Sequence, residues 1–156
     1  MKKIWMAMGI LLLWASVSQA QNIITGEKAP ELKASEWLSR GNYTTNGKAT
    51  VIEFFFSRSE PSMKRLSTLD GFVRSYGDSV SVVLLAREPR EQVGEAVNGK
   101  GYGFAVALDD NGKTFDAYGV QFVPFAVLYD ARGKILWFGN SSKFGNDELE
   151  KAMGWK

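Results

Sequence analysis

Apolar residues in this chain gather in short continuous runs, and amphipathic segments separate the runs. Ala49 to Phe56 (ATVIEFFF) and Val80 to Ala86 (VSVVLLA) are rich in β-branched and aromatic residues. Such runs are typical of strands that are buried on both faces of a sheet. Between them, Ser59 to Tyr76 predicts a helix. Its apolar face consists of Met63, Leu66, Leu69, Phe72 and Val73. A strand, a helix and a strand in this order predict a right-handed parallel βαβ unit.

The rest of the chain continues this α/β pattern. It predicts a helix over Glu91 to Val97, a strand over Phe104 to Leu108, a helical turn over Thr114 to Tyr118, a hairpin of Phe125 to Tyr129 and Ile135 to Gly139, and a terminal helix over Asp147 to Met153. Gln21 to Asn46 is a polar lead-in, in which Glu36 to Leu38 is a candidate helical turn. Because no repeat or second core is visible, we expect a single domain over residues 21–156.

The first twenty residues have the pattern of a secretory signal peptide. Lys2 and Lys3 precede the apolar stretch Ile4 to Val17, and Ser18 and Ala20 are small residues at a signal peptidase site. The apolar stretch is shorter than the roughly 18 residues that a membrane helix needs. We therefore expect export to the periplasm or cell envelope of a bacterium, with residues 1–20 removed and no stable membrane anchor left.

Charge argues against a nucleic-acid partner. Loss of Lys2 and Lys3 reduces the 19 basic residues to 17, which equals the 17 acidic residues. The mature chain therefore lacks the basic excess that would neutralise nucleic-acid phosphates.

The sequence contains neither cysteine nor histidine. This excludes zinc sites built on these residues, Ser-His-Asp triads and thiol chemistry. The acidic turn at Asp109, Asp110 and Asn111 lacks the alternating ligands and the distal glutamate of a calcium loop. We expect no metal and no cofactor.

Two serines three residues apart, Ser59 and Ser62, stand where the helix after the first buried strand should begin. Serine is a favoured N-cap residue, which explains Ser59 without any chemistry. A serine hydrolase would need a base, and without histidine only a lysine such as Lys64 could serve.

Three segments resemble the thioredoxin-like superfamily, in particular exported redoxins of the TlpA/ResA type. They are GEKAPEL at Gly26 to Leu32, GKATVIEFFF at Gly47 to Phe56, and GVQFVPFAVLYDARGKIL at Gly119 to Leu136. The likeness covers nearly the whole mature chain. It implies a three-layer α/β/α sandwich with a mixed central sheet, and a cis bond before Pro124, which would face the active-site motif.

The same resemblance explains the two serines. Aligned on EFFFSRSEPS, the two cysteines of the Cys-x-x-Cys motif fall on Ser59 and Ser62, its tryptophan on Arg58 and its inner proline on Pro61. Glu53 matches the buried acid that assists proton transfer in active relatives. Serine cannot form a disulfide, so disulfide exchange at this site is excluded.

Several residues near these positions allow two interpretations. Glu53 is either a buried remnant of the redox site or a strand-end carboxylate that reaches solvent. Arg58 is either a solvated loop residue or part of an anion site at the helix N-terminus. Phe54 to Phe56 are expected in the core, although one of them could line a surface groove.

In active relatives, the backbone beside the cis-proline pairs with an extended substrate segment, which needs no sulfur. The first hypothesis is therefore a redox-inactive module that binds polypeptides. Its groove would consist of Arg58, Glu60, Pro61, Phe122, Val123, Pro124 and Phe125. The second is an oxidoreductase whose cysteines were deliberately replaced by serine. The third is a structural subunit of an envelope complex, with an envelope protein as its partner.

Overall fold

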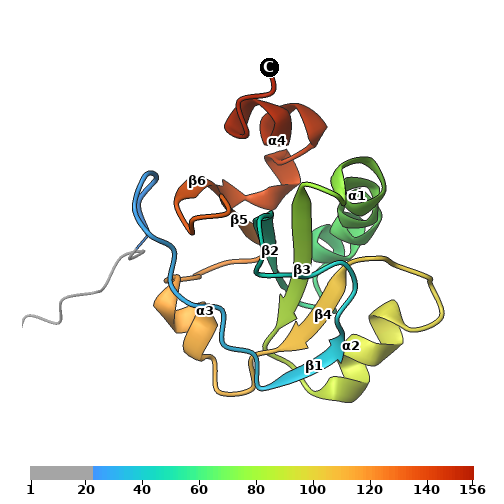
Figure 1. Cartoon of the computed structure of the whole chain (residues 1–156). Helices are drawn as coiled ribbons and strands as arrows, with labels where there is room; N and C mark the ends of the chain where they lie inside the picture. Colours follow the sequence, from blue (N-terminus) through green and yellow to red (C-terminus); the bar gives the residue numbers. More distant parts are fainter. Residues whose placement is uncertain (1–22) are drawn as a thin grey trace, which may run out of the picture.

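A six-stranded sheet forms the centre of the structure, a computed structural model that describes residues 23–156 (Figure 1). The expected signal peptide, residues 1–20, lies outside the described residues. The strands are β1 (Glu36–Ser39), β2 (Ala49–Phe55), β3 (Val80–Ala86), β4 (Ala105–Leu108), β5 (Phe125–Tyr129) and β6 (Ile135–Asn140). The helices are α1 (Glu60–Tyr76), α2 (Arg90–Val97), α3 (Lys113–Ala117) and α4 (Asn146–Ala152), with a 3-10 turn η1 (Ser141–Lys143) before α4.

The sheet is mixed, and its strand order is β1-β4-β3-β2-β5-β6. Strands β2, β3 and β4 run parallel, whereas β1, β5 and β6 pair antiparallel with their neighbours. The predicted parallel unit β2-α1-β3 is confirmed. The chain leaves β2 at the same edge of the sheet where β5 begins, because Phe54 pairs with Phe125.

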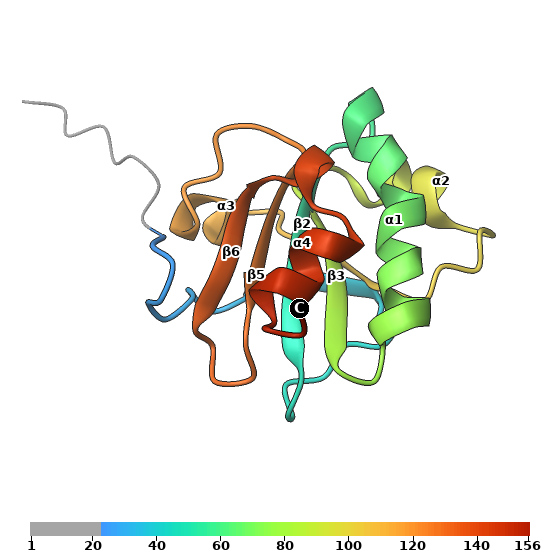
Figure 2. The same ribbon diagram turned by 90° about the horizontal axis from the view of Figure 1, so that it is seen from above.

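Helices cover both faces of the sheet, which confirms the α/β/α layers. Side chains of α1, α2 and α4 share one apolar cluster, and those of α3 share another with the lead-in segment. Figures 1 and 2 show α1 and α4 together on one side of the sheet and α3 on the other. Strand β2 supplies both clusters, because its successive side chains point to opposite faces: Val51 and Phe55 to the first, Ile52 and Phe54 to the second.

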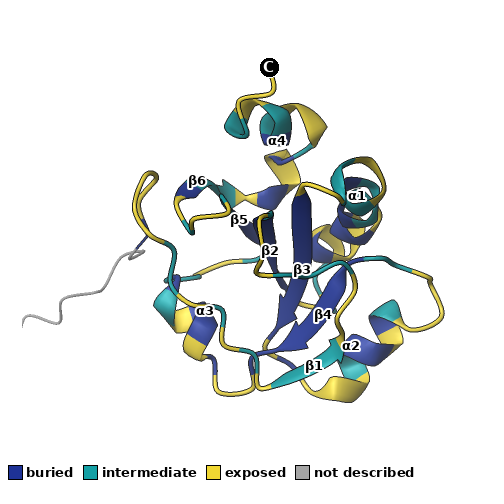
Figure 3. Ribbon diagram, viewed as in Figure 1, coloured by how far each residue is buried: buried dark blue, intermediate teal, exposed yellow. Residues whose placement is uncertain are grey.

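The central strands are the most buried part of the molecule. Every residue of β2 and β3 is buried, as the continuous apolar runs predict, whereas the helices expose their outer faces to solvent (Figure 3). Glu53 lies in the middle of β2 and is therefore an ionisable residue within the core.

Two expectations from the sequence are wrong. Glu36 to Leu38 is not a helical turn but part of β1, which pairs with β4 at the edge of the sheet. The partner strand satisfies its backbone groups, and three residues are too few to show a period. Met63 is 37% exposed and does not belong to the buried face of α1. Ser62, Arg65, Leu66, Leu69 and Phe72 form that face.

Within residues 23–156, none of the helices has the length and apolar character that crossing a membrane requires.

Candidate functional site

The start of α1 follows directly from its sequence. Ser59 is the N-cap, with extended backbone angles, and its hydroxyl accepts a hydrogen bond from the Ser62 backbone N–H at 3.3 Å. Pro61 occupies the first turn, where its missing N–H costs no helical hydrogen bond. The helix therefore begins where the aligned Cys-x-x-Cys motif would lie.

The two serines differ in their surroundings. Ser59 is half-buried at the surface, whereas Ser62 is fully buried under the first turn of α1. No group of the described residues hydrogen-bonds the Ser62 hydroxyl. The pair thus has one accessible member and one enclosed member.

Pro124 reaches this region through the register of β5 on β2. It directly precedes Phe125, the partner of Phe54, so it lies beside the end of β2. The peptide bond between Val123 and Pro124 is cis, and Pro124 is buried. No backbone group of residues 23–156 hydrogen-bonds the N–H or C=O of Val123. The segment before Pro124 therefore offers unpaired backbone groups.

A buried polar network lies behind the start of α1. Oε1 of Glu53 accepts hydrogen bonds from Arg65 Nε at 2.9 Å and from the Ser141 hydroxyl at 2.6 Å. Arg65 also donates to the Phe144 carbonyl at 2.9 Å, and the Ser141 N–H donates to the Pro124 carbonyl at 3.2 Å. The network thus joins α1, β2 and η1 to the residue after the cis bond.

Burial decides between the two interpretations of Glu53, since its side chain has no exposed surface. Burial in the core raises the pKa of Glu53 to about 7, although Arg65 and the hydrogen bond from Ser141 act in the opposite direction. This carboxyl group therefore titrates near neutral pH inside the core, and the strand-end alternative is wrong.

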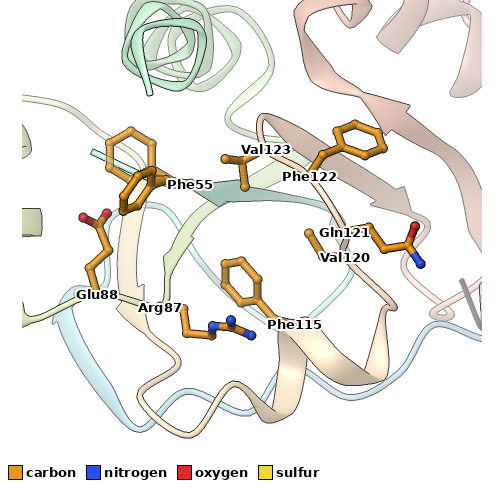
Figure 4. A pocket seen from close by; sticks show the side chains of 9 residues that line it. Phe55, Arg87, Glu88, Phe115, Val120, Gln121, Phe122 and Val123 are labelled. Atoms are coloured by element: carbon orange, nitrogen blue, oxygen red, sulfur yellow. The ribbon is translucent and has the colours of Figure 1, made fainter. Parts of the chain in front are cut away.

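A pocket of about 290 Å³ opens between the end of β2 and the segment before Pro124 (Figure 4). Its walls come from four parts of the chain: the end of β2, the loop after β3, α3 and the segment after α3. The residues that form it are Phe55, Phe56, Arg87, Glu88, Phe115, Val120, Gln121, Phe122 and Val123. We call it the Phe122 pocket.

Apolar side chains are exposed around this pocket. Phe56 is 40% exposed and Phe122 is 47% exposed, and both line its walls. Of the three phenylalanines at the end of β2, only Phe56 lies outside the core. Met63 lines a neighbouring hollow together with Ser57 and Arg58, which belong to the loop that links β2 to α1. Three of the five large apolar side chains exposed within residues 23–156 thus line these two neighbouring hollows.

The residues that were expected to form one groove lie at different places in the structure. Phe122 and Val123 line the Phe122 pocket, and the exposed Arg58 lines the neighbouring hollow. Glu60 and Pro61 are exposed in the first turn of α1, and Glu60 pairs with Lys64 at 3.3 Å. The expectation that Phe125 lines the groove is wrong, because it is fully buried and packs edge-on beneath Phe122 at 5.5 Å.

Sequence reasoning missed Arg65, Ser141 and Glu88. Arg65 could have been found, because it lies four residues before Leu69 and so shares the buried face of α1, where a cation needs a partner such as Glu53. Glu88 is buried behind the loop, where its carboxylate accepts hydrogen bonds from the Ser57 N–H and hydroxyl. Local sequence gives no signal for Ser141, which reaches Glu53 only through the fold.

In the part of the chain that the structure describes, no group of three His, Cys, Asp or Glu side chains could hold a metal ion.

No protein-family model matches this chain, and no curated protein matches it. Solved structures share its fold. The thioredoxin domain of a thiol-disulfide oxidoreductase from Bacteroides vulgatus matches with a TM-score of 0.69 and 20% identity. The alignment covers 85% of this chain and 97% of that domain. A thiol-disulfide isomerase from Corynebacterium glutamicum has a TM-score of 0.71 and 20% identity, with coverages of 83% and 95%. A secreted disulfide oxidoreductase from Mycobacterium tuberculosis has a TM-score of 0.60 and 22% identity, with coverages of 72% and 84%.

Proposed function

We propose that this chain, which has a thioredoxin-like fold and no cysteine, is an exported, redox-inactive module that binds extended polypeptides beside Pro124. The observation that carries the proposal is the combination of the Phe122 pocket with the unpaired backbone of Val123. An extended segment could hydrogen-bond this backbone as an added strand and place a side chain in the pocket.

Exposed apolar surface at the same place supports this function. Phe56 and Phe122 line the Phe122 pocket, and Met63 lines the neighbouring hollow. Large apolar side chains that cluster on a surface are typical of interaction sites, whereas single ones are common everywhere. A structural subunit that does not use the groove has no need of this arrangement, so the clustering favours peptide binding over the third hypothesis.

Photo-crosslinking tests the proposal. A benzoylphenylalanine at position 122 should capture a reduced and alkylated, permanently unfolded polypeptide, and should capture the folded, unreduced form of that polypeptide much less. Trp155 is the matched control, because it is 45% exposed but packs on Tyr76 at the far end of α1, about 24 Å along the helix from its first residue at 1.5 Å per residue. Equal capture from positions 122 and 155 would contradict binding in the groove.

A further inference from the structure

The Phe122 pocket contains a carboxylate that no cation of the described residues neutralises. Glu88 is 6% exposed, and the donors to its two oxygens, the N–H and hydroxyl of Ser57, are both uncharged. Among residues 23–156, no lysine or arginine forms an ion pair with Glu88. A buried anion without a counter-ion is costly, which makes this wall of the pocket attractive to a positive charge.

Within the described part of the chain, Arg87 is the one cationic residue that lines the Phe122 pocket, and its guanidinium points away from Glu88. The Arg87 guanidinium lies 5.4 Å from the centre of the Phe115 ring and 3.7 Å from the Asp116 carboxylate. Figure 4 shows the side chains of Arg87 and Glu88 diverging: the guanidinium lies beneath Phe115, and the Glu88 carboxylate points toward the rings at the end of β2. Arg87 is thus paired with Asp116, and Glu88 remains the unbalanced charge.

Aromatic rings complete the surroundings of this carboxylate. Phe56 and Phe122 expose ring surface on the walls of the pocket, and Phe55 and Phe115 contribute at its base. A lysine or arginine side chain has an apolar stem that suits such walls, and its charged end is attracted to ring faces. A carboxylate among aromatic rings therefore matches a cationic side chain better than an apolar or an acidic one.

We propose that the Phe122 pocket is a specificity subsite for a lysine or arginine side chain of the bound polypeptide, with Glu88 as its counter-ion. The inference rests on the proposed function, because the polypeptide must first lie beside Val123. The Glu88 carboxylate would accept a hydrogen bond from the ammonium or guanidinium group, while the aliphatic stem packs on Phe56 and Phe122.

Three fluorescent peptides that differ at one position test this subsite. Each is an acetylated, extended sequence that carries no charge outside its central residue, which is lysine, norleucine or glutamate, and fluorescence anisotropy gives its Kd. The lysine peptide should bind about tenfold more tightly than the norleucine peptide, and the glutamate peptide should bind most weakly. Added salt should weaken the lysine peptide alone.

Glu88→Gln is the deciding variant. Its amide can accept from the Ser57 N–H and donate to the Ser57 hydroxyl, so the loop keeps its support. The variant should lose the preference for lysine and keep the Kd for norleucine, whereas the exposed control Glu91→Gln should change neither. Equal binding of lysine and norleucine to the unaltered protein, or a lysine preference that survives in Glu88→Gln, would overturn the subsite. Failure of all three peptides to bind would overturn the proposed function as well.

Discussion

The buried Glu53 has a structural role, because it pairs with Arg65 in a protein that has no thiol to protonate. The two side chains form an ion pair at 2.9 Å with almost no exposure, and Ser141 and the Phe144 carbonyl complete the network. A buried pair of this kind adds little net stability, but removal of one partner leaves an uncompensated charge. We infer that the network fixes the start of α1 and Pro124 relative to each other.

Arg65→Met should destabilise the protein more at high pH than at low pH. The folded-state pKa of Glu53 lies at about 7, above its ordinary value of 4.5, so the free energy of unfolding falls as pH rises through this range. Without Arg65 that pKa rises further, and a charged Glu53 has no partner. Urea unfolding should show a loss of about 3 kcal/mol relative to the unaltered protein at about pH 8, and a clearly smaller loss at about pH 5.

The control for this variant is Arg74→Met, which removes an exposed arginine from the same helix. Arg74 pairs with Asp70 at the surface, so its loss should change the free energy of unfolding by about 1 kcal/mol or less at either pH. A loss in Arg65→Met that is the same at both values of pH would mean that Glu53 is not the group that Arg65 neutralises.

At the scale of the elements, the buried strands were the easiest part to predict. The runs at β2 and β3 are continuous, apolar and rich in β-branched residues, and a helix of the right length separates them. Helix α1 begins within one residue of its expected start because Ser59 and Pro61 are strong helix-start residues. These signals depend only on residues that are close in sequence, so they can be recognised without knowledge of the fold.

Features that depend on distant partners could not be predicted in the same way. Strand β1 exists because β4 offers it a free edge, and nothing within Glu36 to Ser39 indicates this. The Phe122 pocket needs side chains from β2, α3 and the loop after β3. Its position beside Pro124 followed from a resemblance, whereas Glu88 became visible only when the loop after β3 was placed against Ser57.

The start of α1 leads to a prediction about the two serines. Their positions three residues apart at a helix start bring their Cα atoms within the roughly 4.4 to 6.8 Å that a disulfide spans. The double change Ser59→Cys and Ser62→Cys should therefore oxidise to an intramolecular disulfide. In Ser59→Cys alone, the thiol should titrate below the ordinary value of about 8.5, because the helix N-terminus favours the thiolate.

Thiol titration and mass spectrometry would measure both results. A double variant that stays reduced under mild oxidant, or a Ser59→Cys thiol whose pKa is not lowered, would contradict the match between these serines and a Cys-x-x-Cys motif.

At the scale of the whole molecule, the thioredoxin-like fold is present and the thiols are absent. Beside the end of β2 lie a cis bond before Pro124, an unpaired backbone at Val123, and a pocket lined by Phe56 and Phe122. These features can hold an extended chain without any redox step. The binding role that we propose uses this edge of the sheet.

An amide NMR titration of the protein with the lysine-centred peptide tests most directly whether polypeptides bind beside Pro124. The largest shift changes should fall on Phe56 to Arg58 and on Gln121 to Val123, with α4 unaffected. The same titration of the Val123→Pro variant, which lacks the backbone N–H at that position, should show weaker binding. Shift changes that centre on another face of the molecule, or saturating peptide that leaves the residues around Pro124 unchanged, would contradict binding beside Pro124.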